Sequence, residues 1–308
     1  MKKKNYVCVG HSTYDITIPV DEYPIENVKY RLKNHIECGG GPASNGAYLL
    51  AKWGEKTTLV SIVGDDHYGH LVYEDFKKIG ANTKYIELHR NHQTTSSYII
   101  ANKTNGSRTI LSSKRPPIRQ LNQDVTVNAD VILLDGEHPE TALKVLVDND
   151  DEQVISVLDA GRLNKDTKLL GKLVTYLVCS RDFAEEFAGI KINYHDIKTI
   201  IACYEKLKKY FDTNVIITLE SHGSFTEING KYKQIPSIKV KALDSTGAGD
   251  IFHGAFTYFI GNEYPLEEAI RLASITAAIS VTRIGSRFSI PELQEVLEYK
   301  EKEEKNKK

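Results

Sequence analysis

The sequence predicts an α/β protein in which helices cover both faces of a mainly parallel sheet. Between residues 131 and 218, short runs of Val, Ile and Leu alternate with helical stretches such as 197–211, and strands with no polar face must be buried on both sides. Residues 13–38 and 94–111 instead alternate polar and apolar side chains, as half-exposed strands do. We therefore expect a large α/β unit and a second, smaller sheet.

The composition favours a protein that acts on a small molecule. The chain has 308 residues and a formal net charge of -1, with both signs spread along it, so it offers no basic field for nucleic acid. Its four cysteines lack a paired metal-binding spacing, which favours a reduced protein. No stretch is apolar enough for the core of a signal peptide or for a membrane span. We expect a cytoplasmic protein that binds neither nucleic acid nor membranes.

The first buried strand is expected at residues 6–9, directly before Gly10. Ligand-binding loops of α/β sheets begin at the carboxyl ends of such strands, and Asp15 lies just beyond this one. The alternating segment that follows predicts strands of the smaller sheet at 16–18 and 30–36.

A glycine-rich stretch, GGGPASNG, occupies residues 39–46 and precedes a helical pattern that ends at Gly54. Glycines ahead of a helix allow a ligand to approach the backbone closely. The spacing is neither the G-x-G-x-x-G of dinucleotide sites nor the G-x-x-x-x-G-K-[ST] of P-loops, which argues against both classes.

Further elements are expected along the rest of the chain. Residues 94–101 and 107–111 predict a hairpin around a turn at 102–106. The other predicted elements are core strands at 57–64, 131–134, 154–158, 176–178 and 214–218, helices at 70–79, 197–211 and 268–283, and a charged tail at 301–308.

A second glycine-rich stretch, DSTGAGD, occupies residues 244–250, between an alternating run at 238–242 and a helix that begins near Ile251. This pattern predicts a strand, a loop and a helix. Backbone amides at a glycine-rich helix N-terminus attract anions such as phosphate. Asp250 would repel such an anion, so it either caps the helix or accepts a proton during a reaction.

Together these stretches resemble the signatures of the PfkB, or ribokinase-like, carbohydrate kinases: DSTGAGD at 244–250, and Gly-Gly, three residues and Asn at 40–45. The resemblance implies a ribokinase-like three-layer α/β/α fold with a mainly parallel central sheet and a small β-sheet lid. Residues 1–12, 38–93 and 112–300 would form the catalytic core, and residues 13–37 and 94–111 would form the lid.

The same resemblance implies roles for single residues in the transfer of a phosphoryl group from ATP to a sugar hydroxyl. Asp250 would be the catalytic base, and Gly247, Ala248 and Gly249 would form the anion hole. Asp15, Gly40, Gly41 and Asn45 would bind the sugar. Thr218, Gly223, Ser274 and Ala277 would line the nucleotide site.

The cofactors that the resemblance implies are ATP, Mg²⁺ and K⁺. Glu137 and Glu185 are expected in the vicinity of Mg²⁺, and Asp244, Thr246, Gly285 and Ser289 around K⁺. The chain departs from the family pattern at two positions, where Ser180 replaces Asn and Glu220 replaces Gly.

Within the family, residues 106–110 and 180–184 favour a ketose such as fructose as substrate, and ribose or a nucleoside is the alternative. Whether the substrate is an anion is left open. A catalytically weak sugar-binding sensor is an alternative from another class, suggested by Ser180 and Glu220, and sugar-dependent ATP consumption distinguishes it from a kinase. A homodimer through the lid is also expected, because exposed sheet edges favour pairing.

Overall fold

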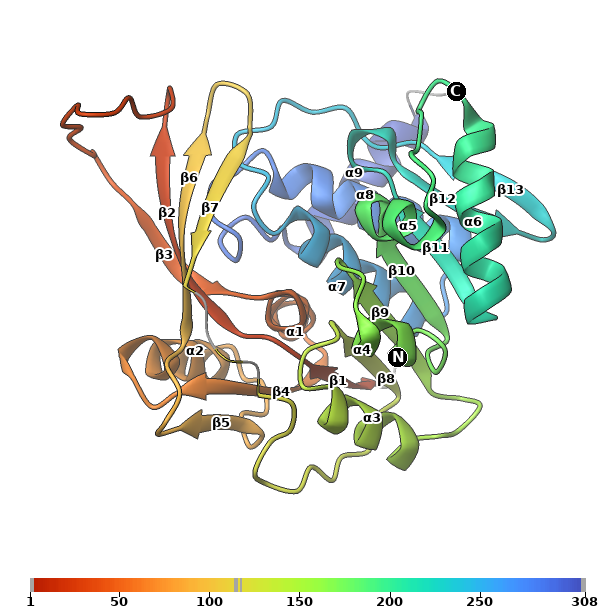
Figure 1. The fold of residues 1–308 in the computed structure, drawn as a ribbon, viewed down its shortest axis with the longest axis horizontal. Helices are drawn as coiled ribbons and strands as arrows, with labels where there is room; N and C mark the ends of the chain where they lie inside the picture. Colours follow the sequence, from red (N-terminus) through yellow and green to blue (C-terminus); the bar gives the residue numbers. More distant parts are fainter. Residues whose placement is uncertain (1–2, 114–115, 117, 306–308) are drawn as a thin grey trace.

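The computed structural model describes residues 3–113, 116 and 118–305. Among these residues, nine strands form the larger sheet: Asn5–Val9 (β1), Lys56–Gly64 (β4), Ile86–His89 (β5), Val131–Leu134 (β8), Ile155–Ala160 (β9), Tyr176–Ser180 (β10), Asn214–Thr218 (β11), Ser224–Ile228 (β12) and Lys231–Ile235 (β13). Their order is β13-β12-β11-β10-β9-β8-β1-β4-β5 (Figure 1). Only β12 runs antiparallel to its neighbours β11 and β13, and the pairs from β11 through β5 are parallel.

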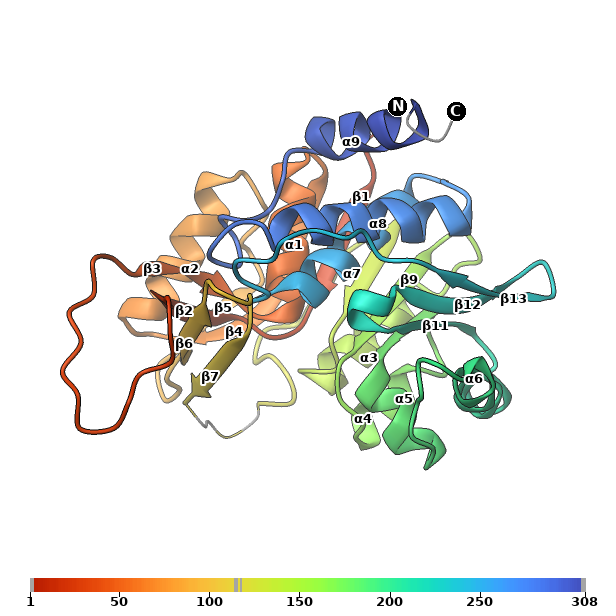
Figure 2. The same ribbon diagram turned by 90° about the horizontal axis from the view of Figure 1, so that it is seen from above.

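Helices cover both faces of this sheet, as the view from above shows (Figure 2). One face carries Pro42–Lys52 (α1), His67–Lys78 (α2), Ala248–Gly261 (α7) and Leu266–Ser280 (α8), and the other carries Pro139–Asp148 (α3), Lys165–Leu170 (α4), Arg181–Ala188 (α5) and Ile197–Phe211 (α6). Alternate side chains of β1 show the division, because Tyr6 and Cys8 pack in the first core and Val7 and Val9 in the second. No helix in the described part of the chain is both long and apolar enough to cross a membrane.

A smaller sheet stands apart from the helical layers, at the left of Figure 1. In the described chain it contains Thr13–Val20 (β2), Ile36–Gly40 (β3), Thr95–Asn102 (β6) and Arg108–Ser112 (β7), in the order β3-β2-β6-β7. The outer strand β7 is exposed along its whole length. The predicted fold class, a three-layer α/β/α unit with a small separate sheet, is confirmed. The expected homodimer stays a prediction.

Most predicted strands and helices are present within a few residues of their expected bounds, including the hairpin formed by β6 and β7. Two predicted strands are wrong. Residues 21–35 are exposed and form no strand, since the β2–β3 pairing ends at Thr17 and Ile36. Residues 238–242 likewise pair with no strand, because β13 ends at Ile235 and an irregular segment leads from it to α7. Alternation favours a strand only where a neighbour supplies hydrogen bonds.

The predicted charged tail is helical over most of its length. Residues 301–305 continue helix α9, Leu293–Lys305, which lies against α8 (Figure 2). Ion pairs between Lys300 and Glu268 and between Arg271 and Glu303 connect the two helices. Residues 306–308 of the predicted tail lie outside the described residues.

Helices α1 and α7 approach each other closely enough that their backbones touch. A Cβ atom added at Gly254 would lie 2.8 Å from the Cα of Gly46, so a larger residue at this crossing would separate the helices. Both helices begin near the carboxyl end of β1 (Figure 1). Their close packing therefore brings the two glycine-rich stretches of the sequence to one place.

Candidate active site

Asp250 lies in the first turn of helix α7, which is capped by Gly247 in a left-handed conformation with φ 73°. Amides in the first turn of a helix have no acceptor within the helix. The backbone N–H groups of Gly249 and Asp250 find no hydrogen-bond acceptor among the described residues. Free N–H groups at a helix N-terminus attract anions, and these two lie in the same turn of α7 as the Asp250 carboxylate.

The Asp250 carboxylate is held by the other glycine-rich stretch. Asn45, near the start of α1, donates a hydrogen bond from Nδ2 to Oδ2 of Asp250 at 2.8 Å. Removal from water raises the pKa of Asp250, and the Asn45 hydrogen bond and the nearby His253 and Arg108 oppose this rise. The arrangement orients one carboxylate oxygen of Asp250, Oδ2.

Asp15 lies in β2 and is buried, accepting a hydrogen bond from Oγ1 of Thr13 at 3.1 Å. Gly40 lies beneath it, and a Cβ atom at Gly40 would lie 2.1 Å from Oδ2 of Asp15. Gly41 has φ 97°, and a Cβ atom there would lie 2.3 Å from the His11 carbonyl oxygen. Gly40 is thus required for the chain to pass this close to the carboxylate, and Gly41 for it to pass the His11 carbonyl group in a left-handed conformation.

Burial raises the pKa of Asp15 to about 6, aided by the negative charge of Asp250. Because the folded pKa lies above the unfolded value of 3.8, the stability contributed by Asp15 is full below about pH 4 and is lost as the pH rises through 6. This difference corresponds to about 3 kcal/mol. Asp15→Asn should therefore gain melting temperature relative to the parent protein as the pH rises.

The measurement is the melting temperature of Asp15→Asn and of the parent protein at pH 4.5 and pH 8. We expect the melting temperature of the variant minus that of the parent to be about 4 °C higher at pH 8 than at pH 4.5. The exposed Asp150→Asn variant is the control and should show no such change. An equal difference at both pH values would contradict the raised pKa of Asp15.

The carboxylate of Asp135, which the sequence analysis did not select, connects the segment after β1 to helix α1. Asp135 follows β8, and its Oδ2 accepts hydrogen bonds from the backbone N–H of His11 at 2.8 Å and of Ala43 at 3.1 Å. It therefore ties the end of β1 to the start of α1, at the point where the strand order of the sheet reverses. Ligands of doubly wound α/β folds bind at this point. The position directly after a core strand was the signal available in the sequence.

Behind Asp250 lies a second pair that the predicted site does not include. His253 is buried in α7, and its Nδ1 is 2.6 Å from the Gly249 carbonyl oxygen and 3.1 Å from Oδ2 of Asp159. Its Nε2 is 3.2 Å from the Val178 carbonyl oxygen. Both ring nitrogens therefore lie beside backbone carbonyl oxygens, which only accept hydrogen bonds. Burial raises the pKa of Asp159 to about 7, and His253 opposes this rise.

The residues predicted for the nucleotide come from two neighbouring parts of the fold. Thr218 ends β11, and Gly223 has φ 90° after the short turn 220–222. Ser274 and Ala277 lie on α8, which packs against β12 and β13. The Ser274 hydroxyl donates to the Ile270 carbonyl oxygen within its own helix.

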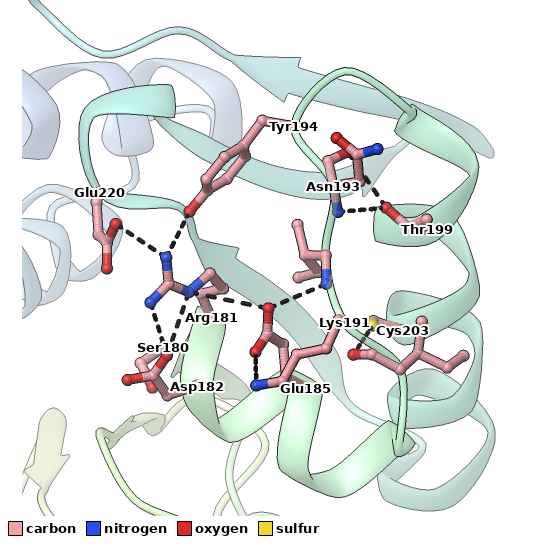
Figure 3. A network of polar contacts seen from close by, with 12 residues as sticks. Ser180, Arg181, Asp182, Glu185, Lys191, Asn193, Tyr194, Thr199, Cys203 and Glu220 are labelled. Carbon is pink, nitrogen blue, oxygen red and sulfur yellow. Dashed lines mark hydrogen bonds and ion pairs between the residues drawn. The ribbon is translucent and has the colours of Figure 1, made fainter.

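Glu220, one of the two departures from the family pattern, belongs to a polar network (Figure 3), whereas the hydroxyl of the other, Ser180, caps α5 by accepting a hydrogen bond from the Phe183 N–H at 3.0 Å. Glu220 accepts a hydrogen bond from Arg181, the residue after Ser180, at 3.3 Å. Arg181 also donates to the Tyr194 hydroxyl at 3.2 Å, and the Tyr194 ring stacks on His222 with centroids 3.6 Å apart. The start of α5, the segment between α5 and α6, and the turn after β11 are thereby connected.

Glu185 does not fit the expected position near Mg²⁺. Its carboxylate accepts hydrogen bonds from Lys191 Nζ at 2.5 Å and from the Ile192 N–H at 3.0 Å, and it secures the turn after α5 (Figure 3). Glu137 is exposed beside Asp135. In the part of the chain that the structure describes, no cluster of three or more His, Cys, Asp or Glu side chains is arranged for a metal ion.

Three of the residues predicted around K⁺ form a compact network. Oδ1 of Asp244 accepts hydrogen bonds from the Thr246 N–H at 2.9 Å and from its hydroxyl at 2.6 Å, and Oδ2 accepts one from the Gly285 N–H at 3.0 Å. Ser289 is joined through its N–H to the Gly285 carbonyl oxygen at 2.9 Å. The loops at 244–247 and 285–289 are therefore connected.

The small sheet contacts the DSTGAGD loop directly. Arg108 of β7 donates a hydrogen bond from Nη1 to the Ser245 hydroxyl at 2.6 Å. At the hairpin turn, Gly106 packs so close to Ala242 that an added Cβ atom would lie 2.6 Å from the Ala242 Cβ. The small sheet thus reaches across to the anion site and brings a positive charge beside it.

The chain was compared with known proteins, and the model of the family described as pfkB family carbohydrate kinase matches residues 3–293. The chain is 27% identical to a ribokinase of Haemophilus influenzae over 97% of this chain and 99% of that protein. The solved ribokinase of Thermotoga maritima is 28% identical, with a TM-score of 0.77 over 97% of this chain and 99% of that chain. A putative ribokinase from Agrobacterium tumefaciens, 24% identical, shares the fold with a TM-score of 0.87 over 96% of this chain and 97% of that chain.

The family match covers nearly the whole described chain, and it includes both glycine-rich stretches and Asp250. The relatives are sugar phosphotransferases, which agrees with an anion site beside a carboxylate. The chain therefore belongs to the pfkB family of carbohydrate kinases.

Proposed function

We propose that this chain transfers the γ-phosphoryl group of ATP to a hydroxyl group of ribose. The observation that carries the proposal is the Asp250 carboxylate, held by Asn45 beside the unpaired N–H groups of Gly249 and Asp250. The relatives named ribokinase favour ribose over the ketose expected from residues 106–110 and 180–184. A ketose therefore becomes a comparison in the test.

In this reaction the sugar oxygen attacks the γ-phosphorus of ATP. A bond forms between that oxygen and phosphorus, the bond from phosphorus to the β,γ-bridging oxygen breaks, and ADP leaves. The hydroxyl proton passes to Oδ1 of Asp250. Because phosphoryl transfer spreads negative charge over the phosphoryl oxygens, positioning and electrostatics supply most of the catalysis. The amides at the start of α7 would meet this charge.

The sugar would lie between the small sheet and the start of α1. Asp15 accepts hydrogen bonds from hydroxyl groups, and Gly40 and Gly41 let the ligand approach the backbone. Asn45 would contact the sugar and the catalytic base together, because its amide already bonds Asp250. Arg108 would bring positive charge from the small sheet toward the phosphoryl group.

For the nucleotide, we propose a site bordered by Thr218, Gly223, Ser274 and Ala277. Mg²⁺ usually binds through one or two carboxylates together with phosphate oxygens and water. Of the two carboxylates predicted for it, only Glu137 is exposed and fits such a role, and Glu185 is committed to Lys191. The metal would neutralise charge on the β- and γ-phosphates.

For K⁺, the predicted residues fit in donor chemistry, since Asp244, Thr246, Gly285 and Ser289 supply carboxylate, hydroxyl and carbonyl oxygens. The Asp244 carboxylate already accepts three hydrogen bonds. The backbone carbonyl groups of these connected loops are therefore the ligands proposed for the ion. Its charge would add to the positive end of α7.

The test is consumption of ATP by the purified protein with Mg²⁺ and K⁺, in the presence of ribose, ketoses, nucleosides or phosphosugars in turn. We expect the highest turnover with ribose and loss of that turnover in Asp250→Asn. Higher turnover with a ketose or a nucleoside would overturn ribose but retain the kinase. No turnover with any substrate, while a sugar still raises the melting temperature, would instead support the sensor.

A further inference from the structure

We propose that Arg287 is a positioning residue that fixes the amide of Asn45, and through it the hydrogen bond that the Asp250 carboxylate receives. This inference rests on the proposed function, in which Asp250 is the base. Arg287 belongs to the loop of residues 285–289, and neither its charge nor its burial is explained by a role of that loop in binding K⁺.

Arg287 occupies a closed slot beneath the sugar side of the site. It is 3% exposed, and its guanidinium lies over the rings of Tyr48 in α1 and Phe76 in α2, at 5.0 Å and 4.8 Å from their centroids. From β3, Gly39 covers it, and a Cβ atom there would lie 2.0 Å from Nη1. Three elements therefore determine where this side chain lies.

The hydrogen bonds of Arg287 point to the start of α1. Nη2 donates to the Ser44 hydroxyl at 2.6 Å, and Nε donates to Oδ1 of Asn45 at 3.4 Å. Nη1 is 3.4 Å from Oδ2 of Asp75, the one carboxylate that forms an ion pair with it among the described residues. A buried guanidinium with so distant a partner is unfavourable for stability, which favours a role other than stabilising the fold.

The chemistry of the guanidinium determines the orientation of the Asn45 amide. Arginine has five N–H donors and no acceptor, so the Asn45 atom that faces it must be the oxygen. The amide nitrogen then faces Asp250, where it donates at 2.8 Å. In the reversed orientation the amide nitrogen would face the guanidinium, donor against donor, and the amide oxygen would face the Asp250 carboxylate, where the two oxygens would repel each other.

The consequence concerns the charge of the base. A hydrogen bond donated to a carboxylate stabilises its charged form, and Asp250 must be charged to accept the sugar proton. Without Arg287 the amide oxygen loses its donor, the reversed amide becomes accessible, and a nearby positive charge is removed. Each change favours the protonated form of Asp250.

Other groups also act on Asp250, and the variants below leave all of them in place. In the described part of the chain, the charged groups that face it are His253 on its own helix, Arg108 on β7, Asp135 after β8, Asp159 on β9 and Asp15 on β2.

The experiment compares the parent protein with two variants. Arg287→Met fills the space between the Tyr48 and Phe76 rings without a hydrogen-bond donor. Arg287→Lys keeps the positive charge but loses the planar set of guanidinium donors. Asp75→Asn is the matched control, because it removes the ion pair and leaves the bond to Asn45. The pKa of Asp250 is read from ¹³C signals of labelled aspartate carboxyl groups and assigned with Asp250→Asn. The pH profile of kcat and the KM for ATP are measured in parallel.

In Arg287→Met we expect the Asp250 carboxyl to titrate at higher pH, and the acid limb of kcat to move with it by about one pH unit. On that acid limb kcat should fall about tenfold at a given pH, with kcat at alkaline pH near that of the parent and the KM for ATP unchanged. Arg287→Lys should shift in the same direction by less, and Asp75→Asn should match the parent.

An Asp250 titration unchanged in both Arg287 variants would overturn the proposal, as would a loss of kcat by one factor at every pH. If Arg287→Met does not fold, the Arg287→Lys titration decides alone. A parent protein that phosphorylates no sugar would refute the proposed function, yet the carboxyl titration would still decide whether Arg287 acts on Asp250.

Discussion

Replacing Asp250 with asparagine is expected to lower kcat by about 10²–10⁴-fold, the range that a positioned general base contributes. The amide has nearly the shape of the carboxylate but cannot accept the sugar proton. Its oxygen can still accept the hydrogen bond from Asn45, so the contact between α1 and α7 is kept. Because removal from water raises the pKa of Asp250, the neutral variant should be no less stable than the parent at pH 8.

This expectation is checked by steady-state kinetics with the substrate found in the screen, together with the melting temperature at pH 8. Asp150→Asn, an exposed change of the same chemistry, should keep full activity. Turnover near that of the parent in Asp250→Asn would remove Asp250 from the mechanism. A large fall in melting temperature would instead assign Asp250 a structural role in the first turn of α7.

Replacing Asp244 with alanine is expected to reduce both stability and activity. The Asp244 side chain is 2% exposed, and its loss leaves the Thr246 N–H, the Thr246 hydroxyl and the Gly285 N–H without their acceptor. Hydrogen bonds to a charged group contribute about 1.5–3 kcal/mol each and are not additive. We expect a loss of about 3–5 kcal/mol, or roughly 6–10 °C in melting temperature.

The same change should lower kcat at least about tenfold, because the DSTGAGD loop loses its connection to residues 285–289 and small displacements at a reacting centre are costly in rate. Asp244→Asn is the graded variant. It keeps an oxygen for Thr246 but turns an amide N–H toward the Gly285 N–H, so its losses should be smaller. Wild-type stability in Asp244→Ala would show that water replaces the carboxylate and that the connection between the loops is unimportant.

Much of the fold could be predicted because core strands carry their signal locally. The runs at 131–134 and 214–218 are apolar throughout, and such strands are stable only when buried on both faces. The predicted strands at 30–36 and 238–242 have the same alternation as β2 but no neighbour to pair with. A strand needs hydrogen bonds from another segment, and the sequence of one segment does not state whether that partner is present.

Some residues of the candidate site could likewise be predicted from local sequence, and others could not. Asp250 and Asn45 could be proposed because each lies in a glycine-rich stretch whose backbone conformation few other residues allow, and Asp15 because it follows the first buried strand. Asp135, His253 and Arg287 could not, because an isolated charged residue in a sequence is usually solvated. Glu185 was expected near Mg²⁺ from the family resemblance, and the structure shows its carboxylate holding the turn after α5 through Lys191.

By itself the sequence determined the α/β class, the two glycine-rich stretches and the carboxylate that follows one of them, since these depend on the period of apolar residues and on local backbone freedom. Only the tertiary structure decided that the stretches meet, through the backbone contact of Gly46 and Gly254. It also decided that the Glu185 carboxylate is bonded to Lys191, whereas the Asp250 carboxylate lies beside the N-terminus of α7. Long-range packing alone sets burial, charge and hydrogen-bond partners, and these set the chemistry of Asp250.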